Sequence, residues 1–96
     1  MQLEQLEIFV AVARCGSFTA AAKQLYISHS STSRAVSALE DELGVRLFRR
    51  GNRVNGLTAA GETLLEEAEK LLDAAETAKK RVKAAADGEN SGEKET

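Results

Sequence analysis

Apolar residues recur at three- and four-residue spacing through the first 43 positions, which is the spacing of one face of an amphipathic helix. The pattern predicts a helix over residues 2–15, a short alanine-rich helix over 18–25 and a third helix over 29–43. Gly16 and Gly44 follow the first and third helices, where a left-handed residue often ends a helix. The predicted inner face of the third helix consists of Thr32, Val36, Leu39 and Leu43.

The periodicity changes after Gly44. Two short runs over 45–49 and 53–55 bracket a Gly-Asn pair, which predicts a small two-stranded hairpin with a tight turn. Thr58 is then placed to cap a long helix, and the polar, glycine-containing residues after that helix predict a disordered tail. The predicted organisation is a head, a long helix and a tail over 1–58, 59–86 and 87–96.

Residues 18–43 have the pattern of a helix-turn-helix, with Ile27 as the apolar residue of the turn. The outward face of its second helix carries hydroxyls, an imidazole and a guanidinium, where an exposed structural helix usually carries Glu and Lys pairs. These groups hydrogen-bond to phosphates and base edges, and their short stems let the backbone enter a major groove. The alternative is a serine-rich first turn that only caps the helix. The candidate DNA-reading residues are His29, Ser30, Ser33, Arg34 and Ser37.

The overall charge of −2 at pH 7 conceals an uneven distribution. Residues 1–60 carry seven basic and five acidic side chains, whereas residues 61–96 carry six basic and ten acidic ones. The hairpin holds four arginines and no acid, which predicts contacts to phosphate or the minor groove; a solvated hairpin is the alternative. Hydroxyls at the start of the 18–25 helix can also meet a phosphate, although capping explains them equally well. The candidate backbone contacts are Ser17, Thr19, Arg49, Arg50 and Arg53.

Residues 59–86 carry an apolar seam that repeats at alternating four- and three-residue steps, as in a coiled coil. A head of 58 residues cannot bury both sides of such a rod, so the seam predicts a homodimer with a second copy of the chain. The alternative is a helix folded back on its own head. The predicted dimer-interface residues are Leu64, Ala68, Leu71, Leu72, Ala75, Ala78 and Val82.

The sequence contains one cysteine and one histidine, which excludes an intramolecular disulfide and a zinc site of these residue types. No cluster of carboxylates with a nucleophile is present, so we expect neither an enzyme nor a cofactor. We also expect no small-molecule site in this chain. The start of the chain has no basic region followed by an apolar targeting run, which predicts a cytoplasmic protein that is not associated with a membrane.

Many short motifs resemble the N-terminal domain of LysR-type transcriptional regulators. The resemblance covers about residues 2–85. The motifs that carry it are Ser17-Phe18-Thr19, Ala21-Ala22, Leu25, Ile27-Ser28, Ser33-Arg34, Leu39-Glu40, Glu42-Leu43-Gly44-Val45, Leu47-Phe48-Arg49-Arg50, Leu57-Thr58 and Ala60-Gly61.

This resemblance implies a mainly α fold, a three-helix winged helix-turn-helix with a small two-stranded wing, followed by a long linker helix that pairs two subunits antiparallel. Two departures concern the recognition helix: His29-Ser30 replaces a common Gln-Pro, and Thr32 replaces an aliphatic residue. Gly56 replaces a frequent basic residue of the wing. The resemblance and the residues together predict sequence-specific binding of double-stranded DNA. The alternative is a helical protein-interaction module that has lost DNA binding, as the acidic pI near 5.4 suggests.

Overall fold

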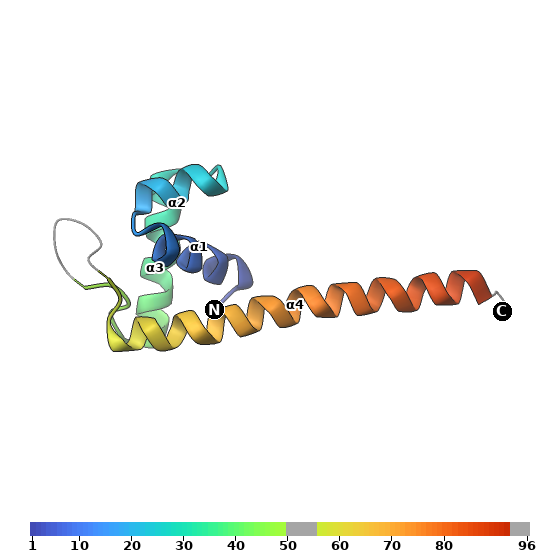
Figure 1. Cartoon of the computed structure of the whole chain (residues 1–96). Coiled ribbons are helices and arrows are strands. Elements are labelled where there is room, and N and C mark those ends of the chain that lie inside the picture. Colours follow the sequence, from blue (N-terminus) through green and yellow to red (C-terminus); the bar gives the residue numbers. More distant parts are fainter. Residues whose placement is uncertain (50–55, 93–96) are drawn as a thin grey trace.

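The computed structural model describes residues 1–49 and 56–92, and of these the side chains through residue 88. Its helices are α1 (Leu3–Cys15), α2 (Phe18–Leu25), α3 (His29–Leu43) and α4 (Ala59–Gly92). Figure 1 shows α1, α2 and α3 gathered at one end of α4, with the rest of α4 extending beyond them as a single rod. None of the helices in the described part of the chain is both long and apolar enough to span a membrane.

Local sequence explains where the first three helices begin and end. Ser17 and Ser28 accept hydrogen bonds from the backbone N–H groups of Ala20 and Ser31, at 3.1 and 3.0 Å. Gly16 and Gly44 end α1 and α3 with φ of 71° and 69°, in the left-handed region that glycine adopts without strain. The three predicted helices are therefore confirmed almost to the residue.

The core lies between α1, α2 and α3, and the first turns of α4 complete it by packing on α1. Phe9 of α1 lies at its centre and packs on Phe48, with ring centroids 5.5 Å apart. Phe18 of α2 approaches the other side of Phe48 at 5.7 Å. The largest fully buried side chains are Phe9, Leu6, Leu39, Leu47, Val12 and Thr32.

Two predictions about α3 have different outcomes. Thr32 is fully buried, as its place on the inner face predicts, and its hydroxyl donates to the Ser28 carbonyl at 3.0 Å. The predicted burial of Leu43 is wrong, since 41% of this residue is exposed. Leu43 is the last residue of α3, and the helix ends directly after it at Gly44, so no further turn of α3 shields its side chain.

The predicted two-stranded wing is not present as a strand pair among the described residues. A single antiparallel bridge joins Phe48 to Leu57, and the Arg49 N–H donates to the Gly56 carbonyl at 3.1 Å. The predicted Gly-Asn turn, together with Arg50 and Arg53, lies outside the described residues.

The predictions for α4 need two corrections. The helix continues to Gly92, so the predicted disordered tail is wrong for residues 87–92. Leu64 and Ala68, predicted to face a partner, are buried in their own chain's core, and Leu72 is half-buried against it. A heptad pattern indicates an apolar face but not which surface covers it, and here α1 covers the first part.

Gly61 allows the first turn of α4 to pack directly on the chain before the bridge. A Cβ at this position would lie far inside contact distance of the Leu47 carbonyl oxygen and 3.0 Å from the Leu57 side chain. Thr58 secures the same approach, because its hydroxyl donates to the Arg46 carbonyl at 2.6 Å and its N–H donates to the Leu47 carbonyl at 3.0 Å.

We therefore expect Gly61→Ala to lower the free energy of unfolding by about 1–3 kcal/mol, because backbone atoms cannot move aside as a flexible side chain can. Gly88→Ala is the matched control, since open space surrounds Gly88 in the same helix. It is expected to stabilise the protein by up to about 1 kcal/mol through helix propensity. Urea unfolding at equal protein concentration measures the change in the free energy of unfolding for each variant. Equal changes for Gly61→Ala and Gly88→Ala would contradict the close packing at Gly61.

Candidate nucleic-acid interface

One face of α3 presents polar side chains that have no partner within the described chain. Ser30, Arg34 and Ser37 are exposed, and Ser33 is half-buried. Their side chains make no hydrogen bond or ion pair with other described residues. Residues three and four apart lie next to each other on a helix, so these groups form a continuous surface of donors and acceptors. We call Ser30, Ser33, Arg34 and Ser37 the α3 face.

The first turn of α3 is stabilised by hydroxyls of residues that are not part of the α3 face. The Ser28 hydroxyl caps the helix and donates to the Ser31 hydroxyl at 3.0 Å. The Ser28 carbonyl accepts from both the N–H and the hydroxyl of Thr32. Capping therefore involves Ser28, Ser31 and Thr32, and leaves the hydroxyls of the α3 face available to another molecule.

His29 lies at the start of α3 and leans toward α2. Its ring centroid is 6.2 Å from that of Phe18, while the residue stays exposed. At the start of α2, Ser17 caps its helix and is half-buried, whereas Thr19 is exposed. The first turns of α2 and α3 both carry backbone N–H groups that have no partner inside their own helix, and such groups attract anions.

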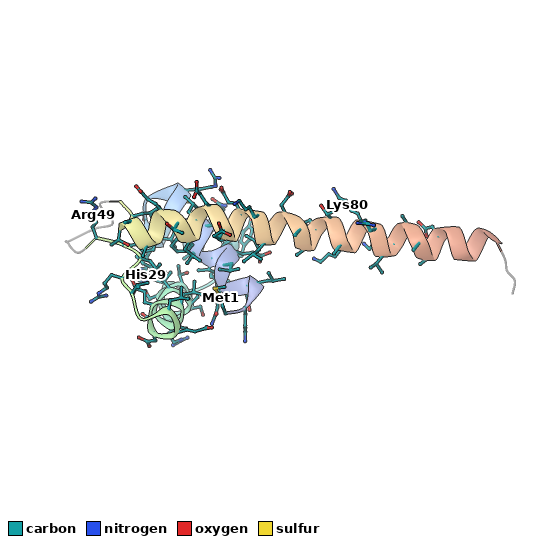
Figure 2. The ribbon with its side chains drawn as sticks, turned by 90° about the horizontal axis from the view of Figure 1, so that it is seen from below. Met1, His29, Arg49 and Lys80 are labelled. Atoms are coloured by element: carbon teal, nitrogen blue, oxygen red, sulfur yellow. The ribbon has the colours of Figure 1, made fainter. Side chains whose placement is uncertain are left out.

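Arg49 is the one described arginine among the three candidate wing residues. Its Nε donates to the Leu57 carbonyl at 3.2 Å, which orients the guanidinium while the residue stays exposed. Figure 2 shows Arg49 and His29 at the same end of the molecule, with Lys80 far along α4 from both.

A shallow groove between the start of α1 and α3 continues the α3 face. Arg34 and Ser37 line it from α3, and Gln2 and Gln5 line it from α1. Sequence analysis gave no role to these two glutamines, because amides in a first helical turn look like any exposed helix end. In the structure they extend the polar surface beside Arg34.

This arrangement suits hydrogen bonding to phosphates and base edges. No group of three or more His, Cys, Asp or Glu side chains in the described residues could hold a metal ion. The α3 face instead combines small hydroxyls with one planar guanidinium, which can bind a guanine edge or a phosphate with two parallel hydrogen bonds.

Residues 3–62 match a family model described as the bacterial regulatory helix-turn-helix protein, lysR family. The chain belongs to the lysR family. The HTH-type transcriptional regulator ClcR of Pseudomonas putida is 47% identical over 89 residues, covering 93% of this chain and 30% of ClcR. The chain thus spans about a third of the length of this lysR-family relative.

Two solved structures resemble this lysR-family chain over most of its length. The crystal structure of the CbnR DBD–DNA complex has 44% sequence identity and a TM-score of 0.85, covering 90% of this chain and 99% of that one. The crystal structure of the BenM DBD/catB site 1 DNA complex has 38% identity and a TM-score of 0.87, covering 93% of this chain and 99% of that one.

The structure adds Tyr26 to the surface features of the helix-turn-helix. It ends α2 in the left-handed conformation, with φ of 58°, and 95% of it is exposed. The sequence pattern predicts only that Tyr26 lies between the helices over 18–25 and 29–43. The exposure of Tyr26 follows from its left-handed backbone conformation, which the spacing of apolar residues does not reveal. The only sign of it in the sequence is a tyrosine next to Ile27, the apolar residue of the turn.

Glu40 connects α3 to the segment that leads to the Phe48–Leu57 bridge of this lysR-family chain. Its Oε2 accepts from the Leu47 N–H at 2.9 Å, and its Oε1 lies 3.5 Å from a guanidinium nitrogen of Arg46. The Glu40 side chain is only 16% exposed, and Leu47 is fully buried. The carboxylate thus supplies the acceptor for a backbone donor that water cannot reach.

We expect Glu40→Ala to lower the free energy of unfolding by about 1–3 kcal/mol, because it leaves the Leu47 N–H without an acceptor. Glu40→Gln keeps an acceptor oxygen and loses only the partly exposed pair with Arg46, so its expected cost is below about 1 kcal/mol. Asp41→Ala removes an exposed carboxylate next to it and is expected to change stability by less than about 0.5 kcal/mol. Urea unfolding of the three variants checks this order; a Glu40→Ala protein as stable as Asp41→Ala would contradict it.

Proposed function

We propose that the chain is the sequence-specific, double-stranded-DNA-binding part of a transcriptional regulator that acts as a homodimer. The observation that carries this proposal is the α3 face, whose polar groups lack partners among the described residues while neighbouring hydroxyls cap the helix. The likeness to the CbnR DBD and BenM DBD structures, whose titles describe DNA complexes, supports the same conclusion.

In this proposal α3 enters the major groove as the recognition helix. Arg34 forms two hydrogen bonds to a guanine edge, or a charge-assisted bond to a phosphate. Ser30, Ser33 and Ser37 accept or donate single bonds beside it, and their small size lets the helix backbone come close to the bases. His29 contributes from the first turn. Ser17 and Thr19, with the first backbone N–H groups of α2, meet a phosphate of the flanking backbone.

The segment after α3 is proposed to form a two-stranded wing that contacts the DNA backbone or the minor groove. The bridge between Phe48 and Leu57 supports a hairpin base, and Arg49 is exposed at that base. Arg50 and Arg53, whose place rests on the sequence alone, add positive charge to the same hairpin. Contacts of this kind position the protein and contribute little to base selection.

The homodimer is proposed to form through the part of α4 that extends beyond the head. Leu71 and Val82 are 43% and 68% exposed there, and Ala75 and Ala78 lie between them at coiled-coil spacing. We call Leu71, Ala75, Ala78 and Val82 the α4 strip. A second copy that covers this strip places two recognition helices on one duplex, which matches an interrupted palindrome. A protein-interaction module that had lost DNA binding would form the same dimer, but it would not require the unpaired polar groups of the α3 face.

We expect Arg34→Ala to weaken binding to a specific duplex by about 1–3 kcal/mol, because the guanidinium bonds are lost. The probe is a duplex recovered by selection from a random library, compared at fixed salt with an unrelated duplex. Arg34→Lys keeps the charge and loses the planar fork, so it should retain binding to the unrelated duplex and lose most of the preference for the specific one.

Lys80→Ala is the matched control, since it removes the same charge from a position far along α4 (Figure 2). It should leave the preference for the specific duplex unchanged. Equal specific affinity of Arg34→Ala and the parent protein at the same salt concentration would show that the α3 face does not read DNA.

A further inference from the structure

His29 is the only histidine of the chain and the first residue of α3. It is exposed, and its imidazole makes no hydrogen bond or ion pair with the residues that the structure describes. Its ring lies 6.2 Å from that of Phe18 of α2, centroid to centroid, with a tilt of 47°. The hydroxyl of Ser28 caps the helix, so capping does not explain an imidazole at this position.

Phe18 gives the imidazole a fixed neighbour on one side. Phe18 is half-buried, and its ring meets the buried ring of Phe48 edge-on at 5.7 Å. The three rings therefore link the first residue of α3, through the first residue of α2, to the core. Because this contact leaves His29 exposed, its ring nitrogens stay accessible to another molecule.

His29 lies beside the α3 face and not within it. It is five residues from Arg34, which is about 140° around the axis of an α-helix. Its ring contact is on the side of α2. A helix in the major groove has base edges in front of it and the phosphates of the two strands on either side. This position favours a phosphate oxygen as the ligand of His29, whereas Arg34 lies at the centre of the face.

The charges around His29 favour an anion that comes from outside the chain. Residues 8–39 contain no Asp or Glu, although the chain has 15 acidic residues in all. The charged residue of α2 is Lys23, the nearest one on α3 is Arg34, and Arg49 lies at the same end of the molecule as His29 (Figure 2). No acid lies in the first turn of α2 or α3. A DNA phosphate therefore supplies the negative charge that these elements lack.

We propose that His29 is a proton-dependent contact to a DNA phosphate and binds it as an imidazolium. Both ring nitrogens are then donors, and the bond to the phosphate oxygen is charge-assisted. Histidine is the residue type that ordinarily changes its charge between about pH 5 and 8. Formation of the complex takes up a proton from the solvent, so binding tightens as the pH falls and weakens as it rises.

This inference rests on the proposed function and adds to it the ligand and the charge state of one residue. A contact to phosphate carries no sequence information, so the pH should act equally on a specific and an unrelated duplex. An added cationic contact also releases counterions, so protonation should steepen the dependence of log Kd on log salt by about one unit for each protomer.

The test measures the Kd of the full chain for a selected and an unrelated duplex between about pH 8 and about pH 6. The series ends above the pI of about 5.4, because a protein is least soluble where its net charge is near zero. The parent Kd should fall by about fivefold for each protomer over this range, equally for both duplexes. Calorimetry in two buffers of different ionisation enthalpy counts the protons taken up.

Two substitutions of His29 separate its charge from its place on the helix. His29→Asn keeps a hydrogen-bonding side chain but cannot take up a proton, so its Kd should stay near the high-pH value of the parent throughout. His29→Lys is charged over the whole series, so it should bind at either end as tightly as the parent does at low pH. Lys80→Ala, far along α4 (Figure 2), should keep the pH dependence of the parent. Circular dichroism at both ends of the series is the control for folding.

A parent Kd that does not change with pH, or a His29→Asn protein with the pH dependence of the parent, would overturn the inference. A pH effect confined to the selected duplex would also overturn it, because His29 would then read a base edge. Arg34→Ala separates these failures from that of the proposed function. If the parent and Arg34→Ala bind both duplexes alike at every pH, the proposed function is wrong. If Arg34→Ala loses a preference that the parent shows, and the pH effect is absent, only the inference is wrong.

Discussion

The segment from Arg46 to Phe48 is hydrogen-bonded to α3 on one side and to the start of α4 on the other. These bonds fix the position of the long helix relative to the head. Glu40 of α3 accepts the Leu47 N–H, while Thr58 at the start of α4 binds the Arg46 and Leu47 carbonyl groups. Gly61 brings the α4 backbone against the same carbonyl of Leu47. The helix α3, the Phe48–Leu57 bridge and the long helix therefore meet at one short stretch of backbone. A dimer can hold two recognition helices at a fixed spacing only if this junction is rigid.

The long helix has two roles along its length. Its first turns complete the core of the head through Leu64 and Ala68, and Arg14 pairs with Glu69 where α1 lies against it. Beyond Leu72, no other element of the described chain packs against the apolar residues of α4. The same helix thus connects the head that carries the α3 face to the surface proposed for the partner.

Helix positions and the α3 face were predictable from the sequence because both depend on local rules. Apolar spacing, serine caps and terminal glycines fix α1, α2 and α3 to within a residue. The burial of Leu64 was not predictable, because a heptad seam does not reveal whether its cover comes from the same chain or from another. The extension of α4 past residue 86 was missed because the glycine at position 88 weakens a helix without ending it. The exposure of Tyr26 depends on a left-handed turn that periodicity does not reveal.

Selection of duplexes from a random library by the parent protein tests the central claim most directly. The account predicts that the recovered sequences share an inverted repeat, with two half-sites at one fixed separation that suits a twofold dimer. It also predicts that the half-site consensus disappears when Arg34→Ala is used in the selection. Recovery of duplexes with no common sequence, retained only through salt-sensitive contacts, would contradict the claim that the α3 face reads DNA.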